Sequence, residues 1–245
     1  MPSCNVLAAD LDIRIFEDRT LVTTVLKLER TGDAPFILNG RDLTLHEVAV
    51  DGRVLDEADW PVCPEGLSLD GLPDRCEVRI VSQCHPDTNT ALEGLYLSGG
   101  MYCTQCEPEG FRRIGFFPDR PDVMTVFTVR VEADSAFPQL LSNGNLVEVG
   151  EAGEGRHFAI WRDPHPKPSY LFACVVGDLD LAADSFTTAS GRKVDLHIYV
   201  EKGNLSLTGH AMESLKKSMK WDEEAYGLEY DLDLFQIVAV SHFNT

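Results

Sequence analysis

Residues 11–28, LDIRIFEDRTLVTTVLKL, carry side chains that alternate in two consecutive segments. The first segment has Leu11, Ile13 and Ile15 at every second position, and the second alternates in the same way over residues 22–28. A β-strand points successive side chains to opposite faces, so a period of two predicts strands that bury one face. The stretch therefore predicts a sheet packed on one side against a core.

The same alternation recurs in short segments as far as about residue 184. These segments are 43–45, 78–80, 146–148 and 158–160. Turn sequences such as Thr31-Gly32-Asp33 and Asn143-Gly144-Asn145 separate them. Many short strands with such turns are typical of two packed sheets. We therefore predict a mainly β fold, with an N-terminal β-sandwich domain over residues 1–184.

A different pattern begins at about residue 185. Residues 193–200, KVDLHIYV, predict a strand, and the nearly continuous apolar run 234–240 predicts a strand that is covered on both faces. The segment between them predicts an amphipathic helix with Met212, Leu215, Met219 and Tyr226 on its apolar face, Thr208 as its cap and Gly227 at its end. Strand, helix and strand predict the incomplete start of an α/β domain over residues 185–245.

Composition narrows the classes of partner and the compartment. The 245 residues include 21 Lys and Arg against 40 Asp and Glu, a net charge of -19, which disfavours nucleic acid and membrane surfaces. No apolar run is long enough to cross a bilayer, and the N-terminus has no signal-peptide pattern. Seven irregularly spaced cysteines favour reduced thiols, so we expect a cytoplasmic protein.

The stretch CTQCEPEG, residues 103–110, raises three interpretations of its two cysteines: a metal site, a redox dithiol or incidental thiols. A zinc site needs a second pair of ligands, and the other cysteines stand singly. A redox pair normally opens a helix after a strand, whereas this segment is acidic and rich in predicted strands. Incidental reduced thiols are the favoured interpretation.

Other catalytic motifs are incomplete in this sequence. The single His-Glu pair, His46-Glu47, is followed by Val50 where a zinc-binding His-Glu-x-x-His helix needs histidine at residue 50, four after His46. Ser98 has Tyr96 where a nucleophile elbow needs glycine, and no phosphate-binding loop is present.

Polar side chains of the 103–110 stretch offer a different chemistry. Glu107 and Glu109 could bind a ligand ammonium, and Gln105 can both donate and accept a hydrogen bond. From the residues alone, solvated loop acids remain the alternative.

Longer blocks of sequence resemble a known family. The run NTALEGLYLSGGMYCTQCEPEGFRRIGFFPDRPDVM, residues 89–124, is similar to the N-terminal domain of the M1 zinc aminopeptidases of the bacterial aminopeptidase N type. Further similar blocks follow in the same order, namely PKPSYLFA at 166–173, SMKWDEE at 218–224 and GLEYDLD at 227–233. The resemblance implies a β-sandwich that caps a thermolysin-like catalytic domain, of which residues 185–245 are the beginning.

The resemblance also implies roles for the loop. In the family, the glutamate that matches Glu107 holds the free α-amine of a peptide substrate, and the glutamine that matches Gln105 lines the first side-chain pocket. The implied parent is a zinc metallopeptidase that removes N-terminal residues from peptides.

Family members continue into a Gly-Ala-Met-Glu-Asn motif and the zinc helix, and this chain ends just before that motif. We therefore expect no catalytic residue, no bound zinc and no activity in these 245 residues alone. Departures from the family at Ser241, His242 and Thr245 leave a second interpretation open. In this second interpretation, the chain is a naturally truncated, non-catalytic binding or assembly module. It would associate with itself through the face left uncovered by the missing catalytic domain.

Overall fold

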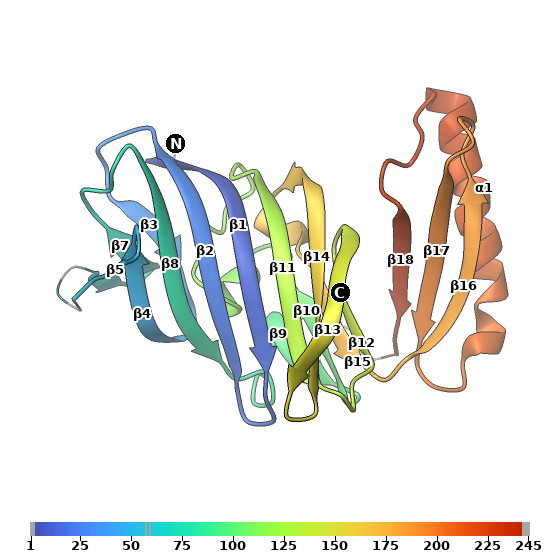
Figure 1. Cartoon of the computed structure of the whole chain (residues 1–245), viewed down its shortest axis with the longest axis horizontal. Helices are drawn as coiled ribbons and strands as arrows, with labels where there is room; N and C mark the ends of the chain where they lie inside the picture. The colour runs from blue at the N-terminus through green and yellow to red at the C-terminus, as the bar shows by residue number, and fades with distance from the viewer. Residues whose placement is uncertain (1–2, 57, 59, 242–245) are drawn as a thin grey trace. The chain divides into compact units, whose positions relative to one another are not determined.

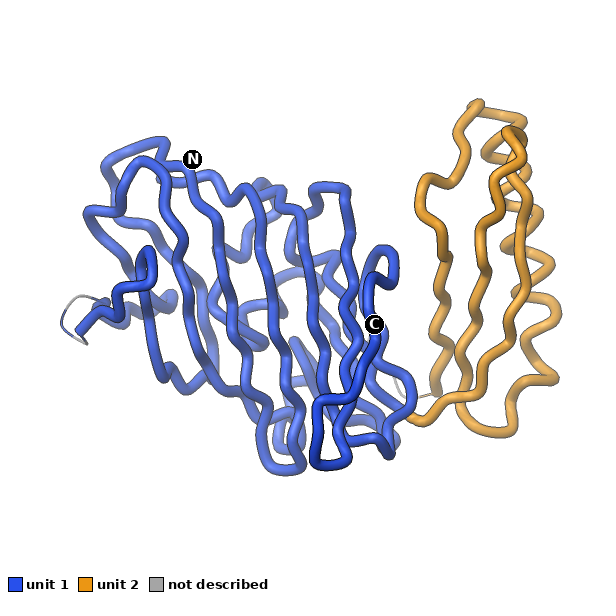
Figure 2. Tube along the Cα trace, in the orientation of Figure 1, with its two compact units in different colours: residues 1–177, 244–245 blue, residues 178–243 orange. Residues whose placement is uncertain are grey.

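A computed structural model describes residues 3–56, 58 and 60–241. The chain is mainly β and divides into two compact units between Gly177 and Asp178 (Figure 1, Figure 2). The expected boundary near residue 184 falls inside a strand, β16 (Asp180–Thr187), which pairs along its whole length with β17 (Lys193–Val200). His242 and Thr245, which the sequence singled out, lie outside the described residues.

Within the described residues, the first unit contains an eight-stranded, a four-stranded and a three-stranded sheet. The large sheet consists of β1 (Cys4–Ile15), β2 (Thr20–Arg30), β4 (Thr44–Val50), β5 (Arg53–Val54), β8 (Arg75–Cys84), β11 (Thr125–Asp134), β13 (Asn145–Gly153) and β14 (Arg156–Lys167). The four-stranded sheet has β9 (Gly94–Ser98), β10 (Met101–Gln105), β12 (Gln139–Ser142) and β15 (Cys174–Gly177). The small sheet has β3 (Phe36–Asn39), β6 (Val62–Cys63) and β7 (Gly66–Leu69), and single 3-10 turns form η2 (Phe111–Arg113) and η3 (Ser169–Leu171). A further 3-10 turn, η4 (Leu205–Leu207), belongs to the second unit.

The alternating stretch at residues 11–28 forms the centre of the large sheet. Strand β1 pairs antiparallel with β2 and parallel with β11, so that Leu11 lies beside both Thr24 and Val129. The side chains of Leu11 and Ile13 are almost fully buried, as the period of two predicts. The prediction of a one-sided sheet is confirmed.

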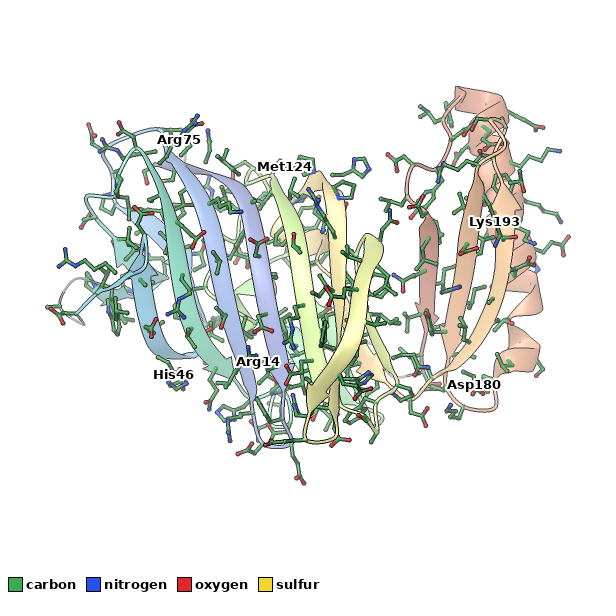
Figure 3. The ribbon with its side chains drawn as sticks, in the orientation of Figure 1. Arg14, His46, Arg75, Met124, Asp180 and Lys193 are labelled. Atoms are coloured by element: carbon green, nitrogen blue, oxygen red, sulfur yellow. The ribbon has the colours of Figure 1, made fainter. Side chains whose placement is uncertain are left out.

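The outward face of the large sheet carries paired charges. Arg14 Nη2 lies 2.7 Å from Asp12 Oδ2, and Arg75 Nη2 lies 2.6 Å from Glu29 Oε1. Figure 3 labels the two arginines. These acids are therefore neutralised locally by neighbouring arginines on this face.

Aromatic side chains fill the space between the two larger sheets. Phe127 on β11 lies with its ring centroid 5.6 Å from that of Phe117 and 6.1 Å from that of Phe111, both in the segment after β10. Trp161 on β14 donates its indole N–H to the Leu140 carbonyl on β12 at 2.8 Å. These contacts join the two layers into the expected sandwich.

The second unit has one sheet, in the order β16-β17-β18, with β18 spanning Leu234–Ala239, and one helix, α1 (Gly209–Tyr226). Strand β17 is antiparallel to β16 and parallel to β18. The apolar core of this unit consists of Val194, Leu196, Ile198 and Val200 from β17 and Met212, Leu215 and Met219 from α1. The predicted strand, helix and strand are confirmed, and β16 adds a strand that the sequence analysis missed.

Three details of this unit differ from expectation. Strand β18 is only half-buried, because it is the edge strand of its sheet among the described residues. Tyr226 is 65% exposed and packs edge-on against Trp221 with ring centroids 5.2 Å apart, so it does not join the core. Thr208 precedes the helix, but its hydroxyl donates to the Leu205 carbonyl and does not cap the helix N–H groups. Gly227 does end the helix, at φ 66°.

Among residues 3–56, 58 and 60–241, no helix combines the length and the apolar character that a membrane span needs.

Replacement of Phe127 by alanine should lower the free energy of unfolding by about 3–5 kcal/mol, because it removes a fully buried ring from the aromatic cluster. Guanidinium unfolding followed by circular dichroism measures the change. The neighbouring Thr128→Ala, on the half-exposed face of the same strand, should change it by about 0.5 kcal/mol or less. Equal losses in the two variants would contradict the packing described for the sandwich.

Candidate functional site

The candidate loop leaves the end of a strand that is fixed on both sides. Gln105 is the last residue of β10 and pairs with Gly94 of β9, and its side chain is half-buried. The loop then runs through Glu107 and Glu109 to η2. The Gly110 N–H donates to the Cys106 carbonyl at 2.8 Å and closes the segment into a tight turn, called the Cys106–Gly110 turn below.

Two glycines allow this turn to lie close to the neighbouring backbone. A Cβ on Gly110 would meet the Gln105 carbonyl oxygen at 2.2 Å and the Cys106 Cα at 2.9 Å. A Cβ on Gly94, which has φ +70°, would meet the Gly110 carbonyl oxygen at 2.9 Å. Any larger residue would push the turn away from the end of β10.

The two acids of the turn differ in their surroundings. Glu109 is paired, since its carboxylate lies 3.0 Å from Arg112 Nη1. Glu107 is exposed, and no hydrogen bond or ion pair joins its side chain to another residue in the described part of the chain. Of the two acids that the sequence offered for an ammonium ligand, Glu107 is therefore the one with an open carboxylate.

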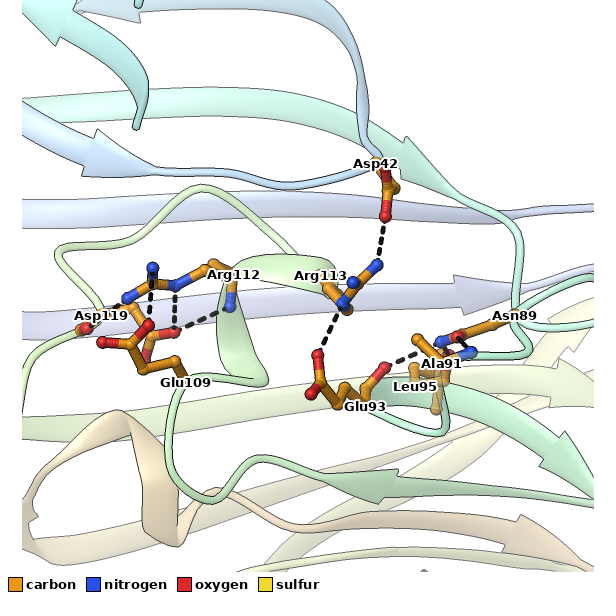
Figure 4. A network of polar contacts seen from close by, with 9 residues as sticks. All are labelled: Asp42, Asn89, Ala91, Glu93, Leu95, Glu109, Arg112, Arg113 and Asp119. Carbon is orange, nitrogen blue, oxygen red and sulfur yellow. Dashed lines mark hydrogen bonds and ion pairs between the residues drawn. The ribbon is translucent and has the colours of Figure 1, made fainter. Parts of the chain in front are cut away.

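A buried carboxylate lies behind the turn. The side chain of Asp119 is 1% exposed and accepts hydrogen bonds from the Arg112 backbone N–H at 3.1 Å and from Arg112 Nε at 3.0 Å (Figure 4). Arg112 Nη2 also donates to the Asp119 carbonyl at 3.0 Å. The second carboxylate oxygen of Asp119 accepts a hydrogen bond from Ser169 Oγ at 2.5 Å. The backbone N–H of Asp119 donates to Asn39 Oδ1 at 3.0 Å. Arg112 thus bridges a buried acid and the exposed Glu109.

The next residue, Arg113, turns to a different set of partners. It contacts Glu93 at 3.0 Å and also pairs with Asp42 (Figure 4). A cavity of about 370 Å³ lies beside it, with Asn89 and His85 in its lining, while neither Gln105 nor Glu107 lines this cavity. The cavity is therefore separate from the candidate site.

Arg112, Asp119 and Ser169 were not among the candidate site residues predicted from the sequence. Arg112 and Asp119 lie in the run 89–124 that carries the family resemblance, but residue spacing does not reveal which acid is buried or which arginine pairs with it. A run of two arginines between two acidic groups was the available signal.

The cysteines of the loop are buried thiols. Burial raises the pKa of the Cys103 thiol, and it raises the pKa of Cys106 well above its usual value. Burial also raises the pKa of Cys174, on the adjacent strand β15, to about 12. Thiols of this kind are poor nucleophiles and poor metal ligands at neutral pH, which agrees with incidental cysteines.

The resemblance implies a zinc ion in the whole protein, and the described part of this chain has no set of side chains suited to bind it. Among residues 3–56, 58 and 60–241, no group of three His, Cys, Asp or Glu side chains could hold a metal ion. His46 is exposed on β4, and the partner of Glu47 is Arg79. The donor set of the described residues therefore does not fit a zinc centre.

Comparisons with known proteins agree with the resemblance. Residues 70–171 match the Peptidase M1 N-terminal domain. The chain is 54% identical over 228 residues to an aminopeptidase N of Caulobacter vibrioides, which covers 92% of this chain and 26% of that protein. It is 49% identical over 246 residues to the aminopeptidase N of Escherichia coli, which covers 99% of this chain and 28% of that protein.

Solved structures agree as well. The crystal structure of Legionella pneumophila aminopeptidase A in complex with aspartic acid matches with a TM-score of 0.94 at 30% identity, over 99% of this chain and 29% of that chain. An M1 zinc metallopeptidase of Deinococcus radiodurans shares the fold, with a TM-score of 0.80 at 15% identity. The chain spans about a quarter of the length of the curated aminopeptidase N relatives that it matches.

The buried thiols should react slowly with a disulfide reagent in the folded chain at pH 8, because little thiolate is present and access is blocked. Of the seven cysteines, Cys63 is the one that is partly exposed, and Cys63→Ser should remove the fast reaction. Peptide mass mapping locates the modified residues, and unfolding in guanidinium should expose all of them. Rapid modification of Cys103 or Cys106 in the folded chain would contradict their burial.

Proposed function

Since this chain belongs to the M1 peptidase family through its N-terminal region, we propose that it supplies the substrate-anchoring loop of a zinc aminopeptidase. In this proposal, Glu107 binds the free α-ammonium of a peptide, and Gln105 lines the pocket for the first side chain. The whole protein would remove N-terminal amino acids from peptides. The observation that carries the proposal is the open carboxylate of Glu107 on a turn that is otherwise held in place.

The chemistry favours a peptide end over a peptide interior. A carboxylate that accepts a hydrogen bond from an ammonium gains about 1.5–3 kcal/mol when water is excluded. An internal peptide bond carries no ammonium and would leave Glu107 without a partner, which penalises the wrong substrate. A carboxylate at a fixed place also sets how far the chain can enter, and so selects one bond for cleavage.

Gln105 suits the wall of a side-chain pocket. Its backbone is tied to Gly94 in the sheet, so the position of its amide is limited by few side-chain torsions. The amide can donate to one polar substrate group and accept from another, and its stem can contact an apolar one.

The described residues do not fit a zinc site, so no step of hydrolysis is assigned to this chain. In the proposal, zinc and the group that activates water come from other parts of the whole protein. We also propose a cytoplasmic location, which the seven free cysteines support. The net charge of -19 disfavours nucleic acid and membranes as partners.

A second candidate is a non-catalytic binding or assembly module of the same family, which would associate with a second copy of itself. Exposed apolar residues in the second unit favour it, since Trp221 is 55%, Tyr226 65% and Leu228 66% exposed. A dimer in sedimentation experiments that Trp221→Ser dissociates would favour this candidate.

The 245-residue chain, supplied with zinc and alanine p-nitroanilide, should release no nitroaniline above a blank, because its described residues hold no group that fits a zinc site. Absorbance at the nitroaniline band measures the release. Chelator-sensitive release by this chain would contradict the proposed division between anchoring loop and catalytic machinery.

In the whole protein, Glu107→Gln should lower kcat/KM for alanine p-nitroanilide by about ten- to a hundredfold, the loss expected for one charge-assisted bond to the substrate amine. Steady-state kinetics measures it. The matched control Glu151→Gln neutralises another exposed acid, on β13, and should leave kcat/KM unchanged. An equal kcat/KM for the Glu107 variant and the unmodified protein would refute the anchoring role.

A further inference from the structure

We propose that Arg112 is a positioning residue that holds the Glu107 carboxylate in place by joining the exposed turn to the buried Asp119. The inference rests on the proposed function of Glu107 and adds the means by which the turn is ordered.

The buried end of this link is fixed from several segments. The carboxylate and carbonyl of Asp119 accept hydrogen bonds from Arg112, and the second carboxylate oxygen accepts one from Ser169 in η3. The Asp119 backbone N–H donates to the Asn39 side chain at the end of β3. Asn39 is itself paired with Phe117, by reciprocal backbone hydrogen bonds of 2.8 and 3.2 Å. Asp119 is therefore anchored to the small sheet and to the segment after β14.

The exposed end of the link is the turn itself. The Cys106–Gly110 turn is closed by its own hydrogen bond, and Cys106 is buried beneath it, but residues 107–109 are exposed. Glu109, two residues after Glu107, forms an ion pair with Arg112. Through Arg112, this pair connects the exposed side of the turn to Asp119.

Arginine is suited to this place because its planar guanidinium has several donors in a fixed arrangement. Nε and Nη2 point to Asp119, while Nη1 points to Glu109, so one rigid group sets both directions. A lysine could meet one of the two partners but not hold both. Order that exists before the substrate arrives lowers the entropy lost on binding.

Two variants separate positioning from folding. Glu109→Gln breaks the exposed pair alone, and exposed pairs contribute little to stability, so the variant should fold normally. Arg112→Lys keeps the charge near Asp119 but loses the fork. Arg120→Lys is the control, because Arg120 lies in the same loop and pairs only with the exposed Asp122 in the described structure.

The first measurement uses the 245-residue chain. Amide hydrogen exchange at Gly110, whose N–H is bonded to Cys106, should become about tenfold faster in Arg112→Lys and faster to a smaller extent in Glu109→Gln. The Arg120→Lys chain should exchange at the original rate. Unchanged exchange at Gly110 in both test variants would overturn the proposal, whatever the role of Glu107.

The second measurement uses the whole protein and alanine p-nitroanilide. Glu109→Gln should raise KM by about two- to fivefold and Arg112→Lys by about tenfold, with kcat little changed. In a Glu107→Gln background both increases should vanish, because the carboxylate that the link positions is absent. Increases of the same size in both backgrounds would mean that Arg112 acts on the fold alone, which overturns the inference. If Glu107→Gln itself has no effect, the proposed function fails, and hydrogen exchange still decides whether Arg112 orders the turn.

Discussion

The buried carboxylate of Asp119 is the constraint on which the loop depends. Its side chain is 1% exposed, and an ionised group at that depth is tolerated only where hydrogen bonds and an opposite charge surround it. Arg112 and Ser169 donate hydrogen bonds to this carboxylate, and Asn39 accepts one from the Asp119 backbone N–H, so three separate segments of the chain meet at this residue. By bringing them together, Asp119 fixes where the loop after β10 leaves the sandwich, and so where Glu107 stands.

The fold was predictable from the sequence where burial alone decides it. The alternation at residues 11–28 identified the central strands, and Met212, Leu215 and Met219 identified the buried face of the helix. Strand β16 was missed because its residues are mostly exposed or half-exposed and alternate weakly. Tyr226 lies at the helical spacing of the core residues, but spacing alone does not show whether the last turn of a helix has a sheet to pack against. The ring of Tyr226 packs on Trp221 at the surface.

The candidate site was predictable in part. Sequence chemistry selected Glu107, Glu109 and Gln105 as polar groups on one loop, and the resemblance chose between the acids. The link between Arg112 and Asp119 was out of reach, because it depends on which carboxylate the folded chain buries. Local sequence assigns the same charge to a buried aspartate and a solvated one, and only the packing of distant segments distinguishes them.

The proposed function depends on the binding of a peptide's terminal amine by Glu107. The most direct measurement is a crystal structure of the whole protein with a free amino acid bound as product. A Glu107 carboxylate oxygen should lie within about 3 Å of the α-amino nitrogen, the distance of a charge-assisted hydrogen bond. An α-amino group bound by other residues, with the Glu107 carboxylate directed into solvent, would contradict it.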